Sequence, residues 1–238
     1  MSDATRPRGD GPVEAGPWPD RLAARALSLG GSPRLRGYDV QRDLAKHYSL
    51  VEVVWLALLG ELPASPREAA LLERVLLFLA PVTVAEAPAH AAALAQHCRS
   101  SAAAVIGIAG LTLAQEGLWV VEAHADLIGW ARGQIAEFPE AFRRPEEAAA
   151  VARLAACLAA LDHRGPVFAE RPGLVGACLA TLVELGFDQP THLVTLWGWA
   201  RLPCALAEGF AAPAGRLSTY PMDLPRFVYE DPDDTCPK

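Results

Sequence analysis

Aromatic side chains are scarce in this chain, and segments that read as β-strand are almost absent. Phe, Trp and Tyr make up 7% of the 238 residues, whereas apolar residues make up 52%, with Ala and Leu the most frequent. Small apolar side chains of this kind favour helices packed closely together over a β-sandwich. We therefore expect an all-α fold.

The sequence also lacks the features that would place it at a membrane or on nucleic acid. No stretch of about 18 apolar residues runs without a charge or a helix breaker, so we expect no membrane-spanning helix. The first thirty residues lack a basic segment followed by an apolar core, which argues against a secretory signal. A net charge of −7 without a basic cluster argues against nucleic acid as a partner. We expect a cytoplasmic protein.

Cysteine is too sparse and too widely spaced to predict a metal site or a disulfide framework. There is no Cys-x-x-Cys pair, and the number of cysteines is odd. Four of the five lie in apolar helical segments, which favours small core residues of a reduced protein. We expect neither a metal nor a cofactor. The five are Cys98, Cys157, Cys178, Cys204 and Cys236.

The chain is organised as a polar tail followed by many helices. Residues 1–17 are rich in Gly, Pro and charge, so we expect a disordered tail. Ser49 and Glu52 form a capping-box pattern ahead of an apolar run that ends at Gly60. A loop is expected at 162–172. The helices that we expect cover about 18–29, 40–47, 50–59, 66–80, 84–98, 101–115, 117–137, 145–161, 173–186 and 190–211.

Three segments carry a resemblance to a known family. They are RGYDVQRDLAKHYSLVEVVWLALLGELP at 36–63, GACLATLVELGFDQPTHLVTLWGWARLPCALAE at 176–208 and PRFVYEDP at 225–232. Together they resemble the citrate synthase and citryl-CoA lyase family. The chain is similar to a short, divergent member of it.

The resemblance implies an architecture. It implies a large helical domain of residues 18–116 and 173–238 and a reduced small domain of residues 117–172. The Ala-rich helix at 101–115 is apolar on nearly every face and carries Gly107 and Gly110, which permit close helix approach. In the family such a helix pairs with its mate in a dimer. The partner is a second copy or a catalytically competent paralogue.

The resemblance also implies a chemistry. In the family an Asp removes a proton from the methyl group of a CoA thioester, and one His stabilises the enolate. A second His polarises the ketone of a 2-oxo acid, whose carboxylates are held by arginines. An acyl-CoA and a 2-oxo acid are therefore the expected substrate class.

All three acid–base positions carry other residues in this chain. Glu116 or Gln115 stands where the first His is expected, and His124 lies two helical turns further on as an interfacial histidine. Gly165 stands at the second His, with Asp162 and His163 close by as candidate replacements. Val175 stands at the Asp and has no proton chemistry. Only nine residues separate Gly165 from Val175, which predicts that a segment has been deleted.

Two arginines match family positions that bind the substrate. Arg201 corresponds to the arginine that contacts the oxo acid carboxylate, and Arg226 to a second family arginine. Cys204 and Glu208 replace a Gly and a His that follow Arg201 in the family. An ion pair between Arg201 and a helix acid such as Glu208 is an equally good interpretation.

Three interpretations remain open. The leading one is a pseudoenzyme, a noncatalytic or regulatory subunit of a homodimer or heterodimer. The second is an active enzyme with altered chemistry, in which Glu116, Asp162, His163 and Arg201 line a cleft between domains. The third is an unrelated helical binding module.

Overall fold

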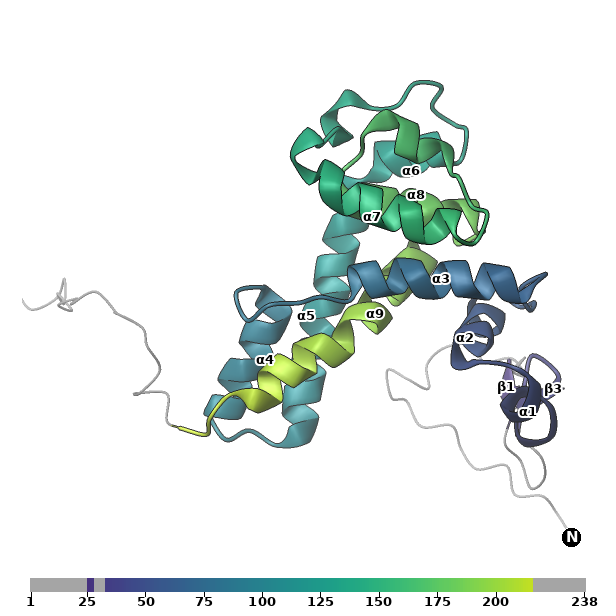
Figure 1. Cartoon of the computed structure of the whole chain (residues 1–238). Helices are drawn as coiled ribbons and strands as arrows, with labels where there is room; N and C mark the ends of the chain where they lie inside the picture. Colours follow the sequence, from purple (N-terminus) through teal and green to yellow (C-terminus); the bar gives the residue numbers. More distant parts are fainter. Residues whose placement is uncertain (1–24, 28–32, 216–238) are drawn as a thin grey trace, which may run out of the picture. The chain divides into compact units, whose positions relative to one another are not determined.

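The computed structural model describes residues 25–27 and 33–215, and it divides the chain into two compact units (Figure 1). The first unit is Met1–Ser65 and the second is Pro66–Lys238. The expected tail at 1–17 lies outside the described residues. The expected division into residues 18–116 with 173–238 and residues 117–172 stays a prediction.

Short strands and a capped helix make up the described part of the first unit. Strands β1 (Ala26–Leu27), β2 (Arg34–Leu35) and β3 (Tyr38–Asp39) form an antiparallel sheet in that order. A π-helical turn, Val40–Leu44, leads into α1 (Ala45–His47), and α2 covers Leu50–Leu59. Ala26 and Leu27 are therefore extended, although a helix was expected at 18–29.

The ends of α2 follow the sequence signals. The Ser49 hydroxyl accepts a hydrogen bond from the amide of Glu52, and the Glu52 carboxylate accepts one from the amide of Ser49. Gly60 ends the helix at φ 91°, a left-handed conformation that favours glycine. The guanidinium of Arg36 donates to the carbonyl of Ala57 at 3.2 Å. The two ends of the 36–63 segment are thus joined by a hydrogen bond.

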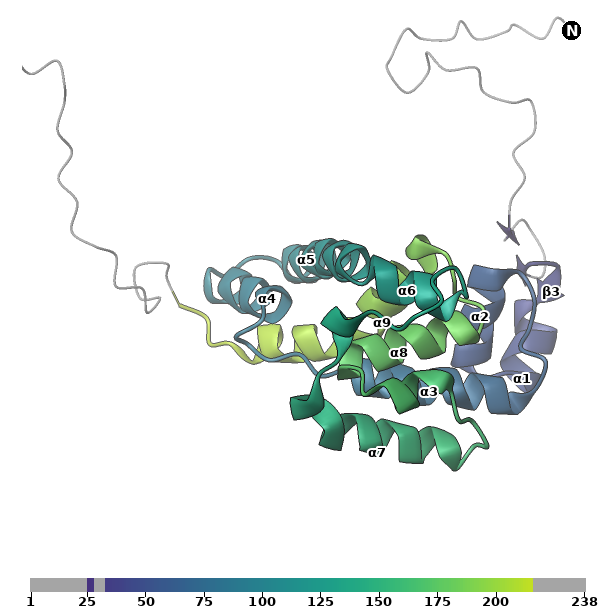
Figure 2. The ribbon, with the colours of Figure 1, turned by 90° about the horizontal axis from the view of Figure 1, so that it is seen from above.

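The second unit is built of helices joined by loops in its described residues (Figures 1 and 2). Helices α4, α5 and α9 pack on one another, while α3 contacts α7, α8 and α9, and α6 contacts α8. The helices are α3 (Pro66–Leu79), α4 (Ala87–His97), α5 (Ala102–Ala123), α6 (Ala125–Ala131), α7 (Ala148–Ala159), α8 (Leu174–Glu184) and α9 (Pro190–Ala211). Short 3₁₀ turns lie at Glu140–Phe142, Pro145–Glu147 and Pro166–Glu170. The all-α prediction is confirmed.

Helix α5 differs from the expectation in length. It continues through Gly117, where a break was expected after residue 115. A Cβ at Gly117 would lie 3.1 Å from the Trp197 ring and 3.3 Å from Val194. The glycine therefore permits close approach of α9 and does not end the helix. The helix expected to run to 137 ends at Ala131 instead.

The cysteine prediction holds for one residue. Cys178 is fully buried on α8, and burial raises the pKa of its thiol to about 12. Cys204 is half-buried, whereas Cys98 and Cys157 are exposed, so the core assignment was wrong for these last two. Cys236 lies outside the described residues.

One side of α5 presents apolar side chains to the outside of the described structure. Leu111 and Trp119 are each 66% exposed, and Ile106 and Leu118 are also exposed. By length and composition alone α5 could cross a membrane, and a third of its most apolar window is buried. The expectation that no helix spans a membrane stays a prediction, since α5 carries Glu116 and Glu122 within its length.

We predict that the contact between α9 and α4 is sensitive to one methyl group. A Cβ at Gly209 would lie 2.6 Å from the Cβ of Ala92, whereas a Cβ at Gly198 on the same helix would meet no atom within 4 Å. Gly209→Ala should lower the free energy of unfolding by about 1–3 kcal/mol through overpacking. Gly198→Ala should raise it by up to about 1 kcal/mol through helix propensity. Chemical denaturation of both variants checks this, and equal effects would contradict it.

Candidate functional site

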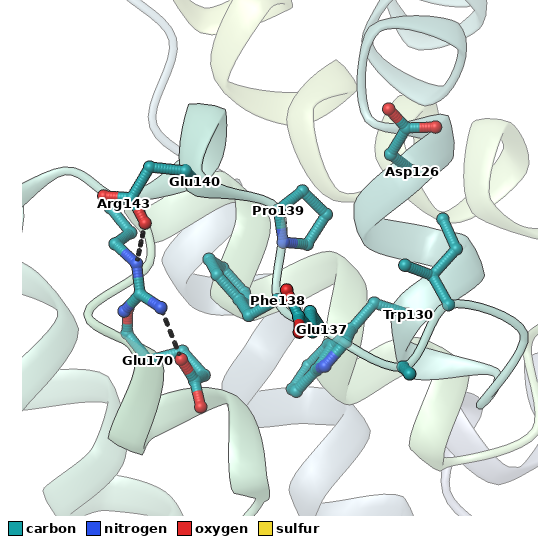
Figure 3. A pocket seen from close by; sticks show the side chains of 10 residues that line it. Asp126, Trp130, Glu137, Phe138, Pro139, Glu140, Arg143 and Glu170 are labelled. Atoms are coloured by element: carbon teal, nitrogen blue, oxygen red, sulfur yellow. Dashed lines mark hydrogen bonds and ion pairs between the residues drawn. The ribbon is translucent and has the colours of Figure 1, made fainter.

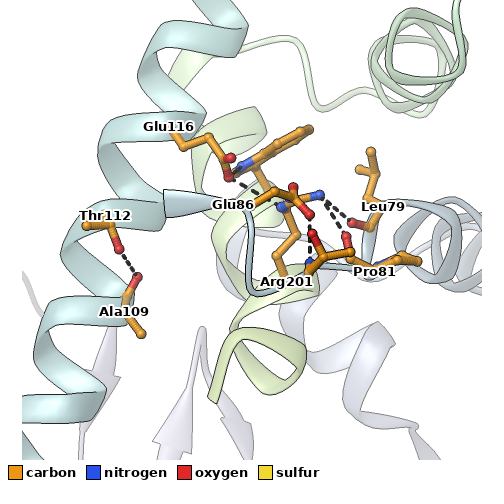
Figure 4. Close-up of polar contacts among 9 residues, drawn as sticks. Leu79, Pro81, Glu86, Ala109, Thr112, Glu116 and Arg201 are labelled. Atoms are coloured by element: carbon orange, nitrogen blue, oxygen red, sulfur yellow. Dashed lines mark hydrogen bonds and ion pairs between the residues drawn. The ribbon is translucent and has the colours of Figure 1, made fainter. Parts of the chain in front are cut away.

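Arg201 is buried in the second unit among groups from four parts of the chain (Figure 4). The side chain is 7% exposed and extends from α9. One guanidinium nitrogen donates to the carbonyl oxygens of Leu79 at 3.1 Å and Pro81 at 3.2 Å. The Trp197 ring lies beneath it, with 4.6 Å between Cζ and the ring centroid. Backbone carbonyls at the end of α3 therefore accept some of the hydrogen bonds that the Arg201 guanidinium can donate.

Two carboxylates of the chain pair with the same guanidinium. Glu86, which precedes α4, accepts a hydrogen bond from Nη2 of Arg201. Oε2 of Glu116 on α5 lies 3.3 Å from Nε and accepts a hydrogen bond from the Trp197 indole at 2.9 Å. The Nε–H of Arg201 is close enough to Glu116 for an ion pair but is not aligned for a hydrogen bond.

The acidity of Glu86 reflects this pairing. Burial on its own would raise its pKa, but the hydrogen bond from the Thr83 amide and the charge of Arg201 outweigh burial and lower it. The expected ion pair of Arg201 with a helix acid thus exists, with Glu86 and Glu116 as the acids in place of Glu208. Glu86 is 115 positions away in the sequence, and no local pattern marks it as the partner.

Asp162 and His163 lie in a separate cluster. Asp162 has a φ of 56°, and its carbonyl and that of Leu161 accept hydrogen bonds from the Arg67 guanidinium. Nε2 of His163 lies 3.2 Å from Oε2 of Glu184. A Cβ at Gly165 would lie 2.7 Å from that same oxygen.

The two clusters lie at opposite ends of α3. Arg67, which binds the 161–162 turn, is near the start of the helix, and Leu79, which binds Arg201, is its last residue. At 1.5 Å per residue this separation is about 18 Å. The structure brings Glu116 and Arg201 together and does not bring Asp162 and His163 to them within one chain. Arg226 lies outside the described residues.

Val175 lines a small cavity at the start of α8. The cavity has a volume of about 220 Å³. Gly165, expected to share a site with Val175, lies instead beside Glu184 at the far end of α8. The cavity is lined by His124, Phe142, Arg144, Glu147, Gly173, Val175 and Gly176.

His124 and Glu147 both line this cavity. The sequence analysis did not place these two residues in one site. Nδ1 of His124 donates to the Val120 carbonyl at 2.8 Å, and the ring stacks on Phe142 at 5.1 Å. Burial, with a contribution from the charge of Arg144, lowers the pKa of His124, although the Val120 bond opposes it. The lowered pKa favours the neutral form of the ring. Glu147 accepts a hydrogen bond from the Leu174 amide at 2.6 Å and so caps α8.

Metal ligands do not gather in the described part of the chain. No group of three or more His, Cys, Asp or Glu side chains there is placed to hold an ion.

Comparison with known proteins identifies the fold. No family model and no curated protein sequence matches the chain. Among solved structures, citryl-CoA lyase from Hydrogenobacter thermophilus matches with a TM-score of 0.67 at 17% sequence identity, over 90% of this chain and 96% of that chain. The chain therefore has an all-α, citrate synthase-like fold of the kind seen in citryl-CoA lyase.

The match takes up nearly all of both chains, so the two chains are of similar length. The predicted deletion between Gly165 and Val175 stays a prediction. The structure places these two residues in different environments, at opposite ends of α8.

We predict that Arg201 is required for stability. Arg201→Met should lower the free energy of unfolding by about 2–4 kcal/mol, because it leaves two carboxylates without their counter-charge while both keep some solvent contact. Glu208→Gln removes an exposed charge from the same helix and should change stability by less than about 0.5 kcal/mol. Urea denaturation of the two variants measures this. A similar small effect from both would show that the cluster is not energetically important.

Proposed function

We propose that this chain is a noncatalytic or regulatory citrate synthase-like subunit. The observation that carries the proposal is the pairing of Arg201 with Glu86 and Glu116. By resemblance, Arg201 is the arginine that would receive the carboxylate of a 2-oxo acid. In this chain its guanidinium is already bound by carboxylates and carbonyls of the protein.

The charge balance of the cluster works against an added anion. One guanidinium faces two carboxylates, which leaves one net negative charge. An incoming dicarboxylate would have to displace Glu86 or Glu116 and would be repelled by the carboxylate that stayed. The resemblance places the first His at Glu116 or Gln115, so if Glu116 is that position, the residue that replaces the His is also an internal anion for Arg201.

The surroundings of Val175 support the same proposal. The side chain at the position of the catalytic Asp is apolar, and the cavity beside it holds about 220 Å³. Small-molecule sites generally occupy about 300–1,000 Å³, and a CoA thioester lies at the large end of that range. The residues and the space at this position both argue against thioester enolisation.

We further propose that the subunit forms a dimer through α5. Its exposed apolar residues include Leu111 and Trp119, and a Cβ at Gly107 or Gly110 would meet no atom within 4 Å. A shallow apolar groove of about 280 Å³ lies between α5 and α9. Small residues beside large apolar ones fit a second helix at close range. The proposed occupant is α5 of a second copy, and a competent paralogue would give the heterodimeric form.

An active enzyme with altered chemistry is the second candidate. One observation favours it: His124 with its lowered pKa, the carboxylate of Glu147 and the guanidinium of Arg144 line the same cavity as Val175. These groups could act on an acyl-CoA and a 2-oxo acid, as lyase or transferase, if the cavity enlarged. The ligand experiment below separates the two candidates.

We predict that the purified protein gives no binding heat with acetyl-CoA or CoA, with or without oxaloacetate. The reason is that Arg201 is occupied and the Val175 cavity is small. Binding of CoA that tightens when oxaloacetate is present would overturn the noncatalytic proposal and favour the enzyme. The double variant Glu86→Gln, Glu116→Gln is the informative companion. If oxaloacetate binds to it and not to the parent, the internal carboxylates are what close the site.

We predict that Leu111→Glu converts the dimer to a monomer. A carboxylate buried at a helix pair costs several kcal/mol, enough to shift the equilibrium by orders of magnitude. Leu77→Glu places the same charge at an exposed leucine on α3 and should leave the dimer intact. Size-exclusion chromatography with light scattering gives the mass of each. A monomeric parent, or equal behaviour of the two variants, would contradict the α5 interface.

A further inference from the structure

A large cavity of the second unit lies in the segment that joins α6 to α7 (Figure 3). Its volume is about 730 Å³, within the usual range for small-molecule sites of about 300–1,000 Å³. None of the chemistry discussed above uses it. Its lining comes from α6, the 135–139 loop and two 3₁₀ turns: Asp126, Trp130, Ile135, Ala136, Glu137, Phe138, Pro139, Glu140, Arg143 and Glu170.

The charges of the wall are strongly unbalanced. Among the described residues of the wall, Arg143 is the one cationic side chain. Its guanidinium pairs with Glu140 at 2.7 Å and with Glu170 at 2.8 Å. Since it also donates to the Glu170 carbonyl, its donors are directed at the wall itself. With Asp126 and Glu137 added, four carboxylates face one guanidinium, which leaves three negative charges.

Two aromatic rings form the apolar part of the wall. Trp130 meets Phe138 edge-on, with 5.1 Å between the ring centroids and 82° between the planes. The Arg143 guanidinium lies over Phe138, with 5.2 Å from Cζ to the ring centroid. The wall therefore already binds one cationic group of its own, the Arg143 guanidinium. It does so through the Phe138 ring and the carboxylates of Glu140 and Glu170. Figure 3 shows Glu137 beside both rings, while Asp126 stands apart on α6.

We propose that this cavity binds an organic cation, an amine or quaternary ammonium with an apolar substituent. Glu137 is the counter-ion and the Trp130 ring contacts the cationic carbon or nitrogen centre, in the way that Phe138 contacts Arg143. Cation–π contacts of this kind contribute about 0.5–2 kcal/mol. Asp126 adds attraction at longer range. The inference is independent of the noncatalytic proposal, because it uses none of the residues around Arg201 or Val175.

The same wall excludes the two other obvious ligand classes. The phosphates of CoA would be repelled by three net negative charges, and the Arg143 guanidinium is already neutralised. A bare metal ion lacks support, since no metal-binding set of His, Cys, Asp or Glu occurs in the described residues. A cation with an apolar part uses both the carboxylates and the rings.

Titration with benzyltrimethylammonium tests the proposal. For a ligand with so few atoms we expect a dissociation constant on the order of 1 mM, followed by the NMR shift of the Trp130 indole N–H. Benzyl alcohol has the same ring without charge, and phenylacetate has the opposite charge. We expect both to bind much more weakly. Equal binding of either one, or no saturable shift with the cation, would overturn the proposal.

Variants identify the contacts. Glu137→Gln keeps the shape of the side chain and should weaken binding about two- to fivefold through loss of one exposed charge. Glu146→Gln makes the same change at an exposed acid outside the cavity and should leave the affinity unchanged. Trp130→Leu should weaken binding by a comparable factor or more. If Trp130→Leu does not fold, the comparison of Glu137→Gln with Glu146→Gln still tests the proposal. Equal affinities of these two variants for benzyltrimethylammonium would overturn it.

Discussion

The positive charge of Arg201 must be balanced inside the protein, because the side chain is 7% exposed and a buried unpaired charge is costly. The chain balances it with carbonyls at the end of α3, with Glu86 ahead of α4 and with Glu116 on α5. Four elements therefore converge on one guanidinium. The arrangement of α3, α4, α5 and α9 in the second unit depends on this cluster as well as on apolar packing.

This cluster also connects the fold to the proposed function. A buried arginine needs an anion close to it. An enzyme that binds an anionic substrate at such an arginine obtains the anion from that substrate. Here Glu86 and Glu116 supply it, so the guanidinium is bound by the protein itself. In the proposed noncatalytic function, this internal pairing takes the place of a bound substrate.

Local signals in the sequence were sufficient for the all-α class and for the ends of α2, and insufficient for the site. The capping box of Ser49 and Glu52 and the left-handed Gly60 determine both ends of α2 by short-range hydrogen bonds, and these ends were predicted correctly. Gly117 was misread as a break because the reason for that glycine is the Trp197 ring, 80 residues later in the chain. The pairing of Glu86 with Arg201 spans 115 positions and follows from packing alone.

The close approach of Gly117 and Trp197 links a packing contact to the charged cluster around Arg201. The contact holds the indole so that its N–H reaches Glu116, which in turn lies against Arg201. A substitution of Glu116 would remove the acceptor of the indole and one counter-charge of Arg201 at the same time. Gly117, Trp197 and Glu116 are therefore energetically coupled, and a change at one of them alters the cost of a change at another.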